Sequence, residues 1–201
     1  MFDDRFRRWI APPLRSPARA LANAGVTANQ VTVAGFVLAA VAAGAVAAGR
    51  PVAGMALWLA SRLLDAVDGA VAREAGALSG FGGYLDLTLD MAAYSLMAVA
   101  FGIVHPEHQL SWLLILMGYV LCITTTAVLS SILERRRAAI PGNDRSIQFA
   151  PGFAEAGETT LVYLALAALP GWAGPIAWAW VAVLLMTAAQ RTLIARRWLH
   201  D

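Results

Sequence analysis

The chain has 201 residues, of which 59% are hydrophobic and 14% charged, with a formal net charge of +2. This composition is typical of one integral membrane domain and excludes a soluble core with a tail. All 15 basic residues are arginine, which excludes covalent catalysis through lysine. The small, dispersed charge excludes a nucleic-acid partner, and a single cysteine, Cys122, excludes an internal disulfide.

Residues 1–28 predict an amphipathic juxtamembrane segment. Apolar side chains recur there at helical spacing, opposite arginines, at Phe2, Phe6, Trp9 and Ile10. Such a helix lies on the anionic membrane surface, and Pro12 and Pro13 end it. A disordered basic tail is the alternative.

Residues 29–201 predict a six-helix membrane domain. Thr27 and Gln30 form a predicted capping box that opens the first helix. Six apolar stretches follow, each close to the length that a bilayer requires, at about 29–49, 51–73, 81–104, 109–133, 151–169 and 172–194. We therefore predict an all-α integral membrane protein with six transmembrane helices after an interfacial helix.

Arginine is divided unequally between the two sides of these helices. The N-terminal segment, the loops at 74–80 and 134–150, and the C-terminus hold nearly all arginines outside the spans, whereas the opposite loops hold only Arg50. The positive-inside rule then places both termini in the cytoplasm. Tryptophans near both ends of the spans suit aromatic belts: Trp58, Trp112 and Trp172 near the outer ends, and Trp9 and Trp198 near the inner ends.

Four aspartates interrupt this apolar pattern. Asp65 and Asp68 are three apart, and Asp86 and Asp90 are four apart, so on helices each pair shares one face. A glycine-rich stretch separates the pairs. If the first helix ends and the second begins there, antiparallel packing brings the carboxylates together in two matched layers near the cytoplasmic face.

Such a cluster needs compensation, because a charge in hydrocarbon costs at least a few kcal/mol. Converging carboxylate oxygens suit hard divalent cations such as Mg²⁺ or Mn²⁺. The sequence therefore predicts a site for two divalent cations, which would offset most of the negative charge.

Eight positions of this stretch fit the signature D-x2-D-G-x2-A-R-x8-G-x3-D-x3-D without a gap: Asp65, Asp68, Gly69, Ala72, Arg73, Gly82, Asp86 and Asp90. The chain thus resembles a small bacterial member of the CDP-alcohol phosphotransferases, also called CDP-alcohol phosphatidyltransferases. The resemblance implies a phospholipid-synthesis enzyme of the bacterial inner membrane, commonly a homodimer among membrane lipids. It would transfer a phosphatidyl group from a CDP-linked lipid, most simply CDP-diacylglycerol, to a small alcohol and release CMP.

The resemblance also implies roles for these residues. Asp65, Asp68 and Asp86 match metal ligands, and Asp90 matches the general base and neighbour of the second metal. Gly69 and Gly82 match positions where a side chain would obstruct the cytidine.

The resemblance also implies contacts to the substrate. Arg73 matches a contact to the diphosphate, with Ala72 beside it. The segment 28–32 matches a further family pattern, except that Ala28 replaces a proline, so Asn29 is a candidate cytidine contact. Helix capping alone would also explain a polar residue there.

Glu155 and Glu158 are three apart near the cytoplasmic end of the fifth predicted span. They are candidates for binding the acceptor alcohol. The alternative is a structural role in which they pair with Arg62 or Arg145.

The acceptor is the least determined feature. Relatives that use phosphorylated acceptors typically place Lys or Arg after the fourth aspartate, where this chain has Met91, and Tyr94 resembles a residue of choline-using relatives. We therefore expect an unphosphorylated acceptor such as choline, another amino alcohol or a polyol. Alternatives are a phosphorylated acceptor such as glycerol 3-phosphate or inositol phosphate, a CDP-amino-alcohol donor, or a divalent-cation transporter.

Overall fold

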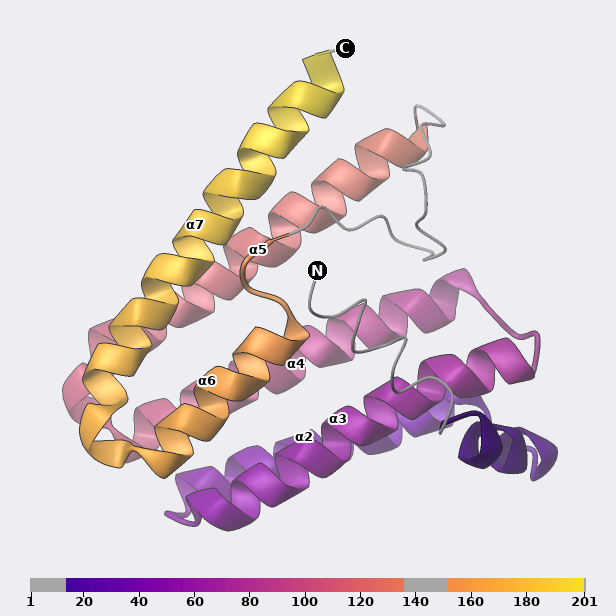
Figure 1. Cartoon of the computed structure of the whole chain (residues 1–201), viewed down its shortest axis with the longest axis horizontal. Coiled ribbons are helices and arrows are strands. Elements are labelled where there is room, and N and C mark those ends of the chain that lie inside the picture. Colours follow the sequence, from indigo (N-terminus) through magenta and orange to yellow (C-terminus); the bar gives the residue numbers. More distant parts are fainter. Residues whose placement is uncertain (1–13, 136–151, 201) are drawn as a thin grey trace.

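The structure is a computed structural model that describes residues 14–135 and 152–200, all of them helical or in short connections. A short helix covers 14–23. The longer helices are α2 (Ala28–Ala47), α3 (Pro51–Glu74), α4 (Gly80–Val104), α5 (Gln109–Arg135), α6 (Ala156–Ala168) and α7 (Ala173–His200) (Figure 1). Two 3₁₀ turns, η1 (Pro106–His108) and η2 (Pro170–Trp172), precede α5 and α7.

Local signals fix the ends of the first three long helices. The predicted capping box is confirmed, because Thr27 Oγ1 accepts from the Gln30 N–H at 3.3 Å and Gln30 Oε1 accepts from the Thr27 N–H at 2.9 Å. After α3, Gly76 takes a left-handed φ of 61°, which glycine adopts without steric cost. Ser79 then caps α4 by accepting from the Gly82 N–H at 3.0 Å.

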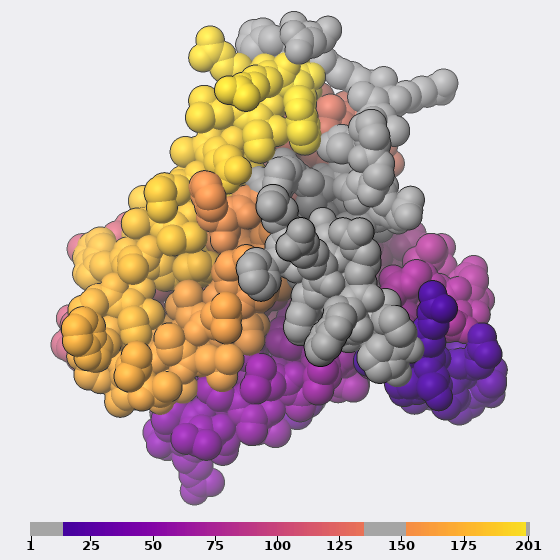
Figure 2. All heavy atoms as spheres, in the orientation of Figure 1, coloured from indigo at the N-terminus to yellow at the C-terminus, as the bar shows by residue number. Residues whose placement is uncertain are grey.

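The helices form two groups that diverge toward one side of the molecule. α2 packs mainly against α3 and α4, whereas α5 packs mainly against α7. α6 contacts α3, α4 and α7, and Figure 2 shows it lying between α7 and the α2–α3 pair. In Figure 1, α5 and α7 move away from α4 toward the C-terminal ends of α5 and α7.

A buried hydrogen-bond chain joins the two groups. The Trp180 indole N–H on α7 donates to the Tyr119 hydroxyl on α5 at 3.1 Å, and the hydroxyls of Tyr119 and Tyr163 lie 2.7 Å apart. The Tyr163 hydroxyl on α6 donates to the main-chain carbonyl of Tyr94 on α4 at 2.7 Å. Each polar atom in this series of hydrogen bonds has a partner. The series therefore connects four helices without leaving any of its own polar groups unpaired in the core.

Four described helices are long and apolar enough to cross a membrane: α2, α4, and α5 and α7 with their preceding turns. The sequence predicted six such helices. α3 is long enough at 24 residues but carries five charged side chains, among them two of the aspartates. α6 has only 13 residues, which is about 20 Å against a hydrocarbon thickness of about 30 Å.

The fifth predicted span begins later than expected because its first residues pair with a neighbouring helix. The Ala154 N–H donates to Thr187 Oγ1 on α7 at 3.0 Å. A Cβ on Gly152 would lie 2.6 Å from Thr187 Cγ2, so the backbone runs directly against α7. Glu155 is extended at the N-cap, and α6 starts only after it.

Two other predictions, the interfacial helix and the aromatic belt, can be compared with the structure only in part. The apolar residues of the predicted interfacial helix lie outside the described residues, but Ala18 in 14–23 is buried against α2 and α3. The aromatic belt is wrong for Trp58 and Trp112, which are 0% and 4% exposed, whereas Trp172 is 64% exposed. Both buried indoles fill the main core, where burying a large ring stabilises more than surface contact does.

Candidate active site

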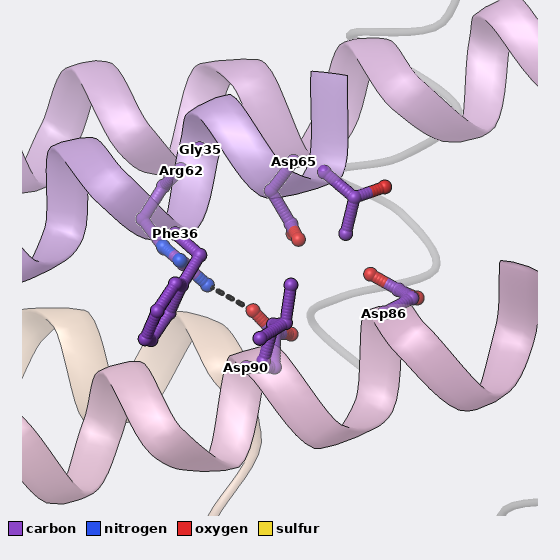
Figure 3. A pocket seen from close by; sticks show the side chains of 8 residues that line it. Gly35, Phe36, Arg62, Asp65, Asp86 and Asp90 are labelled. Carbon is purple, nitrogen blue, oxygen red and sulfur yellow. Dashed lines mark hydrogen bonds and ion pairs between the residues drawn. The ribbon is translucent and has the colours of Figure 1, made fainter. Parts of the chain in front are cut away.

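A pocket lies between α2, α3 and α4 and holds three of the four aspartates (Figure 3). It is lined by Thr32, Gly35, Phe36, Arg62, Asp65, Asp86, Leu89 and Asp90. α3 ends at Glu74 and α4 begins at Gly80, close to the boundaries that the glycine-rich stretch predicted. This short antiparallel turn brings the two aspartate pairs face to face.

The carboxylates of Asp65, Asp68 and Asp86 converge. Each offers one oxygen, and these oxygens lie within 4.8 Å of one another. Figure 3 shows Asp65 on α3 and Asp86 on α4 approaching each other across the pocket. The predicted convergence of the two pairs is therefore confirmed for these three residues.

This donor set fits hard divalent cations. Three carboxylates this close repel one another strongly unless a cation lies between them. Asp68 is only 6% exposed, and its Oδ2 accepts from the Thr32 hydroxyl at 2.6 Å. Oxygen-only ligands that are themselves held by hydrogen bonds are the environment in which proteins bind Mg²⁺ or Mn²⁺.

Asp90 has a different partner. The Arg62 guanidinium on α3 donates from Nη1 to Asp90 Oδ1 at 2.5 Å, drawn as the dashed line in Figure 3. Its Cζ lies 4.7 Å from the ring centre of Trp58 and 5.4 Å from that of Tyr94. Sequence reasoning considered Arg62 only as a partner for Glu155 or Glu158. The sequence could have indicated that Arg62 belongs to the site, because Arg62 precedes Asp65 by three residues and therefore shares its helix face.

Thr32 is a second residue that sequence reasoning did not assign to the site. It lies one turn into α2, is 8% exposed and lines the pocket. Its place in the family pattern that begins at Ala28 was the available signal. The hydrogen bond to Asp68 ties α2 to the carboxylate cluster.

Asn29 and Gly82 meet at the starts of α2 and α4. A Cβ on Gly82 would lie 3.3 Å from Asn29 Oδ1 and 3.2 Å from Ser79 Oγ, tighter than most real contacts. The two candidates for the nucleotide, distant in sequence, are therefore adjacent in space. They lie beside the pocket lining rather than within it.

Gly69 and Arg73 are also adjacent, one turn apart on α3. A Cβ on Gly69 would lie 3.4 Å from Arg73 Nη1, so the guanidinium folds back along the helix toward the glycine. Arg73 is exposed at the end of α3. Ala72 is half-buried beside it, and its carbonyl accepts from the Ala77 N–H at 3.0 Å in the turn toward α4.

Glu155 and Glu158 are not among the residues that line this pocket. Glu155 is the N-cap residue of α6, and Glu158 lies in its first turn. Glu158 Oε2 is buried without a hydrogen bond within the described ranges. In the structure, Arg62 pairs with Asp90. The two glutamates lie at the start of α6 and do not line this pocket.

Comparison with known proteins agrees with the signature. Residues 25–190 match the family described as CDP-alcohol phosphatidyltransferase. The chain is 29% identical over 176 residues to inner membrane protein YnjF of Escherichia coli, covering 86% of this chain and 84% of that protein. It is 31% identical over 192 residues to phosphatidylinositol phosphate synthase of Mycobacteroides abscessus, covering 90% and 81%.

A solved structure shares the fold over most of both chains. It is Mycobacterium tuberculosis phosphatidylinositol phosphate synthase with CDP-DAG bound, which superposes with a TM-score of 0.69 at 25% identity and covers 90% of this chain and 92% of that one. The same mycobacterial protein has also been solved with manganese and citrate. The family match extends well beyond the aspartate stretch, from residue 25 to residue 190, and so includes all or part of every long helix described above. The chain is therefore an enzyme of the CDP-alcohol phosphatidyltransferase family.

Proposed function

We propose that this enzyme transfers a phosphatidyl group from CDP-diacylglycerol to a small alcohol and releases CMP. The observation that carries the proposal is the convergence of Asp65, Asp68 and Asp86, with oxygens within 4.8 Å of one another, beside Asp90 in one pocket. The mycobacterial relative with CDP-DAG bound supports this donor.

The four aspartates have two kinds of role in this mechanism, and Asp90 has both. Asp65, Asp68 and Asp86 would hold the divalent cations, and Asp90 would contribute to holding the second. When bound, two such cations stabilise the negative charge that develops on the attacking and leaving oxygens of an in-line displacement. Thr32 holds the Asp68 carboxylate in place through its 2.6 Å hydrogen bond.

Asp90 acts as the general base. A bond forms between the acceptor oxygen and the phosphorus that carries the lipid, the bond from that phosphorus to CMP breaks, and the hydroxyl proton passes to Asp90. Arg62 holds Oδ1 of this carboxylate, so the group has a fixed orientation in the pocket. The other oxygen is then available to the acceptor.

The nucleotide lies at the ends of α2, α3 and α4 in this proposal. Asn29 and Gly82 form one side, where the absence of a Cβ leaves space against the Asn29 amide. Arg73 binds the diphosphate, which suits a guanidinium that is exposed and lies over Gly69. Ala72 provides a small surface between these groups.

The acceptor in this proposal is a phosphorylated polyol, in place of the unphosphorylated alcohol that Met91 suggested. The Met91 side chain is half-buried and packs against the main core, so its apolar character follows from packing. It is also absent from the pocket lining, where Arg62 supplies a cation. The Mycobacteroides abscessus relative is named for a phosphorylated inositol product, which supports this class of acceptor.

The membrane arrangement is also part of the proposal. Six helices cross the bilayer of the bacterial inner membrane, and α3 crosses it with Arg62 and Asp65 in the pocket. Both termini and the pocket lie toward the cytoplasm, as the arginine asymmetry suggests. The enzyme is a homodimer. Glu155 and Glu158 contact the acceptor from the start of α6.

The deciding experiment is a transfer assay on purified protein in detergent. CDP-diacylglycerol is offered with Mg²⁺ or Mn²⁺ and one acceptor at a time: inositol phosphate, glycerol 3-phosphate, inositol, glycerol or choline. We expect CMP release and a new lipid with a phosphorylated polyol, and neither product in excess chelator. Asp90→Asn should bind the donor but give less than about 1% of the transfer, since a general base contributes about 10²–10⁴-fold.

Two outcomes would contradict the proposal. Undiminished turnover in chelator would exclude the metal-dependent mechanism. Metal flux into liposomes that contain the protein, without any CMP release, would favour a divalent-cation transporter instead.

A further inference from the structure

Three groups around the Arg62 guanidinium form what we call the cation box: the rings of Trp58 and Tyr94 and the carboxylate of Asp90. Trp58 lies one turn before Arg62 on α3, and Tyr94 lies one turn after Asp90 on α4. The two ring centres are 5.5 Å apart with an interplanar angle of 61°. The guanidinium carbon lies 4.7 Å from one ring centre and 5.4 Å from the other, and Nη1 bonds Asp90.

The two aromatic walls of the cation box have contacts that do not involve Arg62. Trp58 is 0% exposed, and its indole N–H donates to Thr160 Oγ1 on α6 at 3.4 Å. Its ring also meets that of Tyr163 edge to face at 5.4 Å. The main-chain carbonyl of Tyr94 accepts the Tyr163 hydroxyl at 2.7 Å. The two rings should therefore keep their places when the guanidinium is removed, whereas Asp90 loses the partner of its Oδ1 and the Tyr94 hydroxyl loses its 3.5 Å hydrogen bond from Nη1.

This composition is one that proteins use to bind organic cations. Aromatic faces within about 6 Å attract a cation through the ring quadrupole, and quaternary ammonium groups are recognised in this way. A carboxylate at the open side adds direct charge attraction. In this chain, however, the cation in the box is a side chain of the protein itself.

The cation box opens onto the candidate active site, because Arg62 and Asp90 both line the pocket. An alcohol that reacts beside Asp90 has its remaining groups within reach of the box. An ammonium group on that alcohol would meet the guanidinium instead of the rings. Like charges this close repel, so the guanidinium and an ammonium group would compete for the same two rings.

We propose that Arg62 determines acceptor specificity: its guanidinium fills the cation box, so the enzyme rejects alcohols that carry an ammonium group. Removal of this guanidinium opens the box to choline or ethanolamine. This inference rests on the proposed function for its transfer assay, but the filled box itself depends only on the geometry above. It also gives Tyr94 a different role from a direct contact to a choline acceptor.

The transfer assay compares the native enzyme with Arg62→Ala and Arg62→Lys. We expect at most trace phosphatidylcholine from the native enzyme and from Arg62→Lys, which keeps a cation in the box. Arg62→Ala should form it at least about tenfold faster than the native enzyme, as expected for two cation–π contacts. Phosphatidylcholine formed equally by all three proteins would overturn the inference.

A binding measurement keeps the inference testable if Arg62→Ala cannot turn over. Tetramethylammonium chloride is titrated into each purified protein by calorimetry, with Arg62→Gln as a second neutral variant in case the alanine variant fails to fold. Both neutral variants should bind at least about tenfold more tightly than the native enzyme. Adding Tyr94→Leu to either should remove the gain.

The two proposals fail in different ways. A native enzyme that transfers to no acceptor, with neutral variants that bind tetramethylammonium, would contradict the proposed function and support the filled box. A native enzyme that transfers to a polyol phosphate, with folded neutral variants that bind no tetramethylammonium, would overturn the role of Arg62 alone.

Discussion

The Thr32 hydroxyl on α2 donates a hydrogen bond of 2.6 Å to Oδ2 of Asp68 on α3. Asp68 is the most buried residue of the carboxylate cluster, so this bond holds a carboxylate that water reaches poorly. It also connects α2, which carries no acidic residue, to the carboxylate cluster.

Thr32→Val should weaken metal binding. Valine keeps the shape of threonine but removes the hydroxyl, which leaves Asp68 Oδ2 without its donor. Partners of this kind typically change metal affinity by about 10–100-fold. Calorimetric titration of Mn²⁺ into the purified protein measures the change. Thr32→Ser, which keeps the hydroxyl, is the control, and equal Mn²⁺ affinity in both variants would show that the bond does not support the cluster.

Gly82→Ala should weaken donor binding. The added Cβ would press on Asn29 Oδ1 at 3.3 Å, and the amide would have to move from its place beside the pocket. If one hydrogen bond to the nucleotide is lost, about 0.5–1.5 kcal/mol, the KM for CDP-diacylglycerol rises up to roughly tenfold with kcat little changed.

Gly80→Ala is the matched control for this change. Gly80 also lies at the start of α4, but a Cβ there meets nothing within 4 Å. Its kinetics should equal those of the native enzyme. The same KM for CDP-diacylglycerol in both variants would contradict the idea that Gly82 keeps space for the nucleotide.

Gly54→Ala should destabilise the fold at a close contact between α2 and α3. A Cβ on Gly54 would lie 2.5 Å from Val46 Cγ2 and 2.9 Å from the Ala42 carbonyl oxygen. The Ala42 carbonyl is part of the backbone and cannot rotate away as a side chain can. Overpacking of this kind lowers the free energy of unfolding by about 1–3 kcal/mol. Thermal unfolding in detergent should show a lower Tm.

Gly44→Ala on α2 is the control for overpacking. A Cβ at Gly44 meets nothing within 4 Å, so this helical glycine should accept alanine with a gain of about 0.5–1 kcal/mol. A Tm that falls equally in both variants would point to a loss of helix flexibility rather than to a clash.

The aspartate spacing was enough to predict much of the site. Positions three and four apart, with glycines between the pairs, predicted two antiparallel helices with facing carboxylates, and Asp65, Asp68 and Asp86 converge as expected. This succeeded because helical periodicity and a short turn leave few ways to arrange the two pairs. The capping box at Thr27 was predictable for the same reason, since it is formed within four residues.

Contacts between distant segments were not predictable from one sequence. The pairing of Arg62 with Asp90, rather than with Glu155 or Glu158, depends on how α3 turns against α4. The late start of α6 depends on the hydroxyl of Thr187 on another helix. Trp58 matched a membrane belt by its position in the sequence, but its 0% exposure results from the packing of α6.

The proposed orientation predicts which surface loops a membrane-impermeant thiol reagent reaches in intact cells. Cys122 is buried, and Cys122→Ala removes it as a background label. In that variant, Glu107→Cys should be labelled, because Glu107 is exposed in η1 on the side with few arginines. Ala77→Cys, in the exposed turn between α3 and α4, should be labelled only after the cells are permeabilised. Since that turn directly joins the two aspartate pairs, labelling of Ala77→Cys in intact cells would place the pocket toward the outside, away from a cytoplasmic supply of CDP-linked lipid.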